Sequence, residues 1–303
     1  MTRKDYNLEN VTSSFCIQVL KGFGQIMLQD NALTGLIFLI GIFYGSPLMG
    51  VAGLIAVLVG TITARLLKFD KADIDKGLYG FNAALIGVAC ILFFKTSFIV
   101  WGLVIIGSIL ATLIQYFFLK RKASVYTLTF VLITWLFVLL ANHYFSSILI
   151  EKSAATPIVH NDFSFSLIGF GQVIFQSKLI PSLLFFVAVF INSPIAALYG
   201  LAGATLGGII SYYFSAPDES ISIGLFSYNA VLCAIAFVGN RIKDSIWILA
   251  SVLLSVVLSL VMTKYDLLQL TFPFVVASII ILFVKNKVIA MSRNVTTQIK
   301  IED

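Results

Sequence analysis

The chain contains two copies of one pattern. Residues 22–89 align without a gap onto residues 169–236 at a constant offset of 147, and 21 of these 68 positions are identical. The matches include amides and glycines as well as apolar residues, for example Asn82 with Asn229 and Gly53 with Gly200. Shared hydrophobicity does not require such residues at one spacing, so the match indicates an internal structural repeat.

The composition places this repeat in a membrane. Of the 303 residues, 59% are hydrophobic and 11% are charged, and the mean hydropathy is +1.02. Uncharged stretches such as residues 31–64 and 179–217 have room for two spans of about 20 residues each. We count ten spans and predict an all-α membrane protein. Its two domains are a first five-span repeat, residues 1–150, and a second five-span repeat, residues 151–303. The first includes an N-terminal tail of residues 1–14, and the second a polar C-terminal tail from about Ser292.

The distribution of charge predicts the topology. An odd number of spans per repeat reverses the second copy, so we expect two inverted-topology repeats related by a pseudo-two-fold axis in the membrane plane. With the N-terminus inside, sixteen of the 20 Lys and Arg residues fall on the cytoplasmic side and four on the other. This predicts a multi-pass protein of the inner cell membrane with both termini in the cytoplasm. The net charge of +6 then reflects topology and does not indicate nucleic-acid binding.

Each half begins with a segment that is too short and too polar for a span. Residues 15–31 and 164–178 are rich in Gly and Gln and reach about half of a membrane, and a second short element precedes the last span of each half, at 124–130 and 268–274. Half-depth backbone is tolerated only where protein covers it or water reaches it. We therefore expect re-entrant pore helices around a central pore.

Two repeated amides are candidate binding groups. Gln25 and Gln172 are the fourth residues of the matching GFGQ segments. An amide in apolar surroundings costs a few kcal/mol unless it is hydrogen-bonded. A polar contact between helices is the ordinary explanation, whereas equivalent positions on two discontinuous elements favour a binding site.

Aromatic, aliphatic and hydroxyl side chains recur with them. Phe81 with Leu85, and Tyr228 with Leu232, lie four residues apart on one helical face, where core packing is the alternative explanation. Thr127 recurs at an offset of 144 as Thr271, and the alternative for both is a bond to a carbonyl one turn earlier.

Together these groups suit one kind of solute. Amide and hydroxyl oxygens as acceptors, aromatic walls and no fixed charge fit a small, neutral, planar molecule with several N–H donors. The spans contain no titratable pair and no set of metal ligands, so we expect neither an intramembrane enzyme nor an ion-coupled transporter, and no cofactor.

The chain resembles the urea transporter family over essentially residues 15–285. The resemblance is carried by the doubled GxGQ element, by the doubled element GLYGFNAAL and GLFSYNAVL, and by the Thr-Phe-Pro-Phe of residues 271–274. It implies ten spans and two pairs of re-entrant helices around a central pore in each protomer of a homotrimer embedded in lipid. It also implies passive passage of urea through a narrow, neutral selectivity filter. The alternative is a facilitator for another small neutral amide or ammonia.

The same resemblance implies a set of pore residues. Two glutamines would stand at the mouths of the filter, four residues would form aromatic slots with two leucines beside them, and two threonines would narrow the centre. These residues are Gln25 and Gln172; Leu28, Phe81, Phe175 and Tyr228; Leu85 and Leu232; and Thr127 and Thr271. The chain departs from the family pattern at Leu28, where an aromatic is usual, at Tyr228, where Phe is usual, and at Thr129, where proline is usual.

Overall fold

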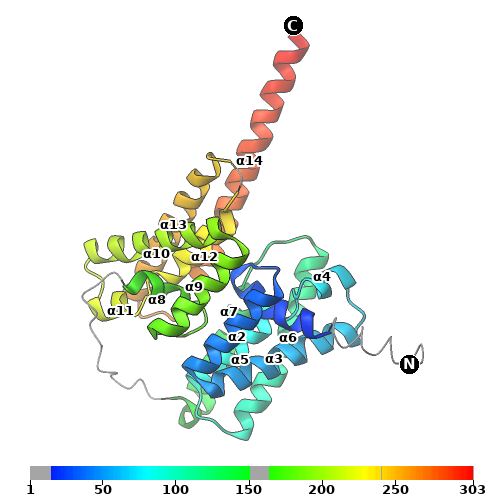
Figure 1. Cartoon of the computed structure of the whole chain (residues 1–303), viewed down its shortest axis with the longest axis vertical. Coiled ribbons are helices and arrows are strands. Elements are labelled where there is room, and N and C mark those ends of the chain that lie inside the picture. Colours follow the sequence, from blue (N-terminus) through cyan, green and yellow to red (C-terminus); the bar gives the residue numbers. More distant parts are fainter. Residues whose placement is uncertain (1–14, 151–163, 240, 303) are drawn as a thin grey trace.

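The computed structural model describes residues 15–150, 164–239 and 241–302 (Figure 1). The described chain is helical, and its one β interaction is an isolated bridge between Phe94 and Leu149. The prediction of an all-α protein is therefore confirmed. The predicted N-terminal tail, residues 1–14, and residues 151–163 of the segment joining the two halves lie outside the described residues.

The helices follow one another in the same order in both halves. In the first half, residues 15–24 are helical. They are followed by η1 (Gln25–Met27), α2 (Ala32–Gly45), α3 (Pro47–Leu66), α4 (Lys71–Asp75), α5 (Phe81–Phe93), α6 (Phe98–Lys120), α7 (Leu128–Tyr144) and η2 (Ser146–Ile148). The second half contains α8 (Ser164–Gln172), α9 (Leu179–Asn192), α10 (Pro194–Tyr213), α11 (Asp218–Ser222), α12 (Tyr228–Phe237), α13 (Asp244–Lys264) and α14 (Phe272–Glu302).

The repeat in the sequence is also a repeat in the backbone. Helices α2, α3 and α4 begin and end 147 residues before α9, α10 and α11. Left-handed backbone conformations recur at the same offsets. The pairs are Leu28 (φ 61°) with Phe175 (φ 57°), Gly77 (φ 73°) with Gly224 (φ 75°), and Tyr126 (φ 49°) with Leu270 (φ 44°). A β-branched or bulky residue rarely adopts positive φ, so these turns are specific features that both halves share.

The repeated Ser-Pro pair explains how α3 and α10 begin. The hydroxyl oxygens of Ser46 and Ser193 accept the backbone N–H of Met49 and Ala196, each at 3.4 Å. Proline follows at the first position of each helix, where its missing N–H leaves no bond unmade.

Several helices are long and apolar enough to cross a membrane. Among the described residues these are Pro47–Leu66, Phe98–Lys120, Pro194–Tyr213, Asp244–Lys264 and Phe272–Met291. Residues 15–27 and α2 together form a sixth candidate that is bent by 76°. The remaining apolar helices, α5, α7, α9 and α12, have 10 to 17 residues. The protein is thus a multi-pass membrane protein, and the count of ten spans stays a prediction.

Two expected segments take a different form. The elements expected at 124–130 and 268–274 each consist of four non-helical residues followed by the start of α7 or α14. Helix α14 continues through Glu302 and so includes most of the segment that we expected to be a polar tail from about Ser292. No Gly or Pro follows Pro273, so nothing in the sequence interrupts this helix.

The two halves meet along α2 and α9, which lie side by side in Figure 1. At the centre of this contact Phe38 packs edge-on against its own equivalent, Phe185, with ring centroids 5.2 Å apart. Asn192 donates to Gln29 Oε1 at 2.8 Å, and Gln176, the equivalent of Gln29, lies directly against Gly45, the equivalent of Asn192. Contacts of this reciprocal kind are typical of copies that face each other across a two-fold axis.

The helix of residues 15–24 packs closely on α2. A Cβ added to Gly35 would overlap the backbone carbonyl of Leu20, whereas Gly102 on α6 has nothing within 4 Å of its Cβ position. We expect Gly35→Ala to destabilise the protein by about 1–3 kcal/mol because the two helices must separate. Thermal unfolding of the detergent-solubilised protein measures this, with Gly102→Ala as the control. Equal melting temperatures for the two variants would contradict the close packing.

Candidate functional site

Glycine-to-glycine contacts hold the two repeated motifs against each other. A Cβ on Gly224 would lie 2.8 Å from the backbone nitrogen of Gly169, and Gly77 is placed in the same way against Gly22. Gly77 and Gly224 also have positive φ, which a side chain disfavours. The motifs therefore recur together because each is the packing partner of the other, and the GFGQ segments are anchored just before α5 and α12.

A tight turn ends each GFGQ segment. Leu28 N–H donates to Gln25 O at 3.0 Å, and Phe175 N–H donates to Gln172 O at 3.1 Å. The next amide side chain folds back onto the turn: Gln29 Nε2 donates to Met27 O at 2.8 Å, and Gln176 Nε2 donates to Ile174 O at 3.3 Å. Helix ends leave carbonyls without partners, and these two glutamines supply the missing donors.

Asn82 and Asn229 clamp the non-helical loops that precede α7 and α14. Asn82 Oδ1 accepts the N–H of Phe130 at 3.2 Å, and Asn229 Oδ1 accepts that of Phe274 at 3.1 Å. The side-chain nitrogens point the other way, to the carbonyls of Tyr126 at 3.5 Å and Leu270 at 3.3 Å. One amide thus bonds both sides of each loop, and all four groups are equivalent between the halves.

These loops and turns line two cavities. The first cavity has a volume of about 270 Å³ and the second of about 680 Å³. Nine residues of the first cavity have their equivalents in the second. They are Gln25, Leu28, Leu78, Phe81, Lys122, Ala123, Ser124, Val125 and Tyr126, matched by Gln172, Phe175, Leu225, Tyr228, Asp266, Leu267, Leu268, Gln269 and Leu270. The cavities are therefore two copies of one site.

The two threonines meet directly. Thr127 and Thr271 follow the cavity-lining residues Tyr126 and Leu270, and their hydroxyl oxygens are hydrogen-bonded to each other at 2.7 Å. Both are buried. The alternative that each hydroxyl bonds a carbonyl one turn earlier is not what the structure has, because each hydroxyl bonds its own equivalent in the other half.

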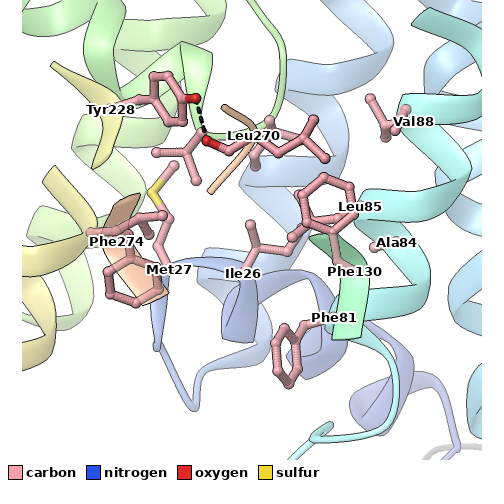
Figure 2. Packing of buried hydrophobic residues seen from close by; sticks show 14 of the residues in the cluster. Ile26, Met27, Phe81, Ala84, Leu85, Val88, Phe130, Tyr228, Leu270 and Phe274 are labelled. Atoms are coloured by element: carbon pink, nitrogen blue, oxygen red, sulfur yellow. Dashed lines mark hydrogen bonds between the residues drawn. The ribbon is translucent and has the colours of Figure 1, made fainter. Parts of the chain in front are cut away.

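The remaining candidates divide into two groups. Gln25, Leu28 and Phe81 line the first cavity, and Gln172, Phe175 and Tyr228 line the second. Leu85 and Leu232 line neither cavity and are fully buried. Figure 2 shows Leu85 beside Phe130 and Ile26, in the packing between Phe81 at one end of the view and Tyr228 at the other.

The two glutamines differ in their bonds. Gln25 Nε2 donates to the carbonyl of Lys76 at 3.0 Å, in the loop before α5. Gln172 is half-buried, and its side chain has no hydrogen-bond partner among the described residues. An interhelical polar contact therefore accounts for Gln25 in part, whereas the Gln172 amide is available to a molecule in the second cavity.

Sequence reasoning missed Gln115, which lines the first cavity. Its Oε1 accepts Asn82 Nδ2 at 3.1 Å and the Thr129 hydroxyl at 3.5 Å. The corresponding residues of the second half are Ser259 and Pro273, so a search for repeated residues passes over this pair. The bond to Gln115 also gives the Thr129 hydroxyl a partner at the position where the family pattern has proline. The signal in the sequence that could have indicated Gln115 is that it is an amide within the uncharged part of α6.

The comparison with known proteins identifies the family. A family model described as urea transporter matches residues 17–286. The chain belongs to the urea transporter family. Among curated relatives, urea transporter 1 of Capra hircus is 28% identical over 295 residues, which are 89% of this chain and 77% of that protein. Urea transporter 1 of Ovis aries is 27% identical over the same shares, and that of Mus musculus is 28% identical over 250 residues, or 76% and 64%.

Membership in the urea transporter family also decides whether the protein is a transporter or an enzyme. The family consists of channel-type transporters, so the protein is a transporter and not an enzyme. Across the described residues no group of three His, Cys, Asp or Glu side chains is arranged to hold a metal ion.

The asparagine clamp leads to a stability prediction. In Asn229→Ala the buried Phe274 N–H loses its acceptor, which we expect to cost about 1–3 kcal/mol because a buried donor is left unpaired. Thermal unfolding in detergent measures the loss. Asn142→Ala is the matched control, since Asn142 is exposed and makes no hydrogen bond among the described residues. The clamp would be refuted if Asn229→Ala melted together with the control.

Proposed function

We propose that this protein is a passive urea channel in which urea moves down its gradient from one cavity to the other past the threonine pair. Transport of urea follows from membership in the urea transporter family. The channel mechanism is supported by one observation above all: two equivalent cavities follow the same turns and loops of the two halves, and the bonded threonines are the next residues in the chain after Tyr126 and Leu270, which line them.

The solute would exchange one set of hydrogen bonds for another along this path. Gln25 and Gln172 offer amide groups at the mouths, Leu28 with Phe81 and Phe175 with Tyr228 form flat apolar walls, and the threonine hydroxyls offer acceptors at the centre. In the structure one of the two hydroxyls donates its hydrogen bond to the other. A passing urea replaces that bond by bonds to itself, and such an exchange is nearly neutral in free energy because no polar group is left unpaired.

The architecture that we propose extends this symmetry to the membrane. The reciprocal contacts between α2 and α9 and the pairing of Phe38 and Thr127 with their own equivalents support a two-fold relation between domains 1–150 and 151–303. In a bilayer this relation corresponds to two inverted five-span repeats with ten spans in all. The excess of basic residues on one side supports an inner-membrane protein with both termini in the cytoplasm.

The family resemblance adds the remaining parts of the proposal. These are a homotrimer in contact with membrane lipid, one pore per protomer, and a neutral selectivity filter between the cavities. Conduction of a different small amide or of ammonia is the alternative. It is not favoured, because the family and the named relatives are urea transporters.

Purified protein in liposomes tests the function. We expect urea to equilibrate faster than in protein-free vesicles, with no dependence on a proton or sodium gradient, because a channel does not couple the movement of its solute to that of a second ion. Stopped-flow light scattering after a urea jump measures the rate. Accumulation above equilibrium in the presence of an ion gradient would refute a channel, and rates equal to those of protein-free vesicles would refute urea as the solute.

The threonine pair leads to a separate prediction. Thr271→Val preserves the shape of the side chain and removes one acceptor, so we expect urea flux to fall severalfold while the protein stays folded. The control is Thr63→Val, since Thr63 donates only to the carbonyl of Val59 in its own helix at 2.8 Å. Unchanged flux in monodisperse Thr271→Val protein would exclude the hydroxyl from the path.

A further inference from the structure

One difference between the two cavities is a hydroxyl oxygen that only the second contains. Phe81 and Tyr228 occupy equivalent positions at the start of α5 and α12, and each lines its cavity. The Tyr228 hydroxyl donates a hydrogen bond to the carbonyl oxygen of Leu270, as Figure 2 shows. Phe81 lies at the opposite end of that view and has no hydroxyl to make the corresponding bond to Tyr126.

This difference changes which acceptors each cavity offers. A backbone carbonyl has two lone pairs. The Leu270 carbonyl uses both, one for the Tyr228 hydroxyl and one for Asn229 Nδ2 at 3.3 Å. The Tyr126 carbonyl accepts, among the described residues, only Asn82 Nδ2, and at the longer distance of 3.5 Å. Leu270 and Tyr126 line equivalent positions of the two cavities. The carbonyl of the first half thus has a lone pair without a partner among the described residues, where that of the second half has none to spare.

We propose that the Tyr228 hydroxyl is a specificity-determining group that withholds the Leu270 carbonyl from permeating solutes. This inference rests on the proposed function, and it names the residue that makes the two ends of the proposed pore bind solute differently. A solute N–H reaches the Leu270 oxygen only by displacing the hydroxyl. At this position the second cavity therefore holds a solute N–H more weakly than the first, and urea flux is limited by this step.

The bond also holds the aromatic ring in place. Tyr228 is buried against the start of its helix, and the hydroxyl ties the tip of the ring to the loop before α14. Phe81 has no such tie. The same hydrogen bond thus occupies an acceptor and fixes the wall beside it, and both effects act on the second cavity alone.

Removing the hydroxyl tests the proposal in reconstituted protein. We expect Tyr228→Phe to raise urea permeability about two- to tenfold, the range that corresponds to one ordinary hydrogen bond. We expect the mirror substitution Phe81→Tyr to lower it by a similar factor, because a hydroxyl there reaches the Tyr126 carbonyl. Size-exclusion profiles and melting temperatures establish that both variants are folded.

A second solute separates this effect from a change of pore width. The gain for Tyr228→Phe is expected to be smaller for 1,3-dimethylurea, which has half as many N–H donors as urea. An equal gain for both solutes, unchanged urea flux or reduced urea flux would each overturn the proposal. Reduced flux would mean that the hydroxyl oxygen itself serves the solute. These outcomes are distinct from failure of the proposed function, in which the unmodified protein would conduct no urea at all.

Discussion

The bonds of Asn82 and Asn229 are the interaction on which the proposed pathway depends. Helices α7 and α14 begin inside the protein, where the first N–H groups of a helix have no partner within it. Each asparagine accepts one of these N–H groups and donates to a carbonyl on the other side of the same loop. An aspartate at either position would lack the N–H donor, and a leucine would lack both the donor and the acceptor. With the loops fixed, Thr127 and Thr271 are close enough to bond each other.

Duplication constrains the structure in a second way. Each position on the contact between the halves occurs once in each copy. Gln29 therefore contacts Asn192, and its equivalent Gln176 contacts Gly45, the equivalent of Asn192. The glycines that bring the GFGQ segments against α5 and α12 are likewise needed in both halves. Departures from the repeat are therefore informative. Examples at or near the cavities are Gln115 with Ser259, Phe81 with Tyr228 and Lys122 with Asp266.

The repeat made much of this predictable from sequence. The offset of 147 anticipated which helices would correspond, and the offset of 144 paired Thr127 with Thr271. The partners of these residues were not predictable, because the bonds of Asn82 and Asn229 connect segments 41 to 48 residues apart through tertiary contact. Gln115 was missed because the second half has Ser259 at the equivalent position. Leu85 and Leu232 were assigned beside the slots by resemblance, and in the structure they are buried and line neither cavity.

The difference between the two ends of the proposed pore affects how urea flux depends on direction. A pore without an energy source cannot rectify: at low solute concentration the inward and outward permeabilities are equal, since the same barrier is crossed either way. A difference between the Phe81 and Tyr228 ends emerges only when one end fills, because conduction then depends on how readily a bound solute leaves. Saturation would therefore set in at different concentrations on the two faces of the membrane, although the pore favours neither direction.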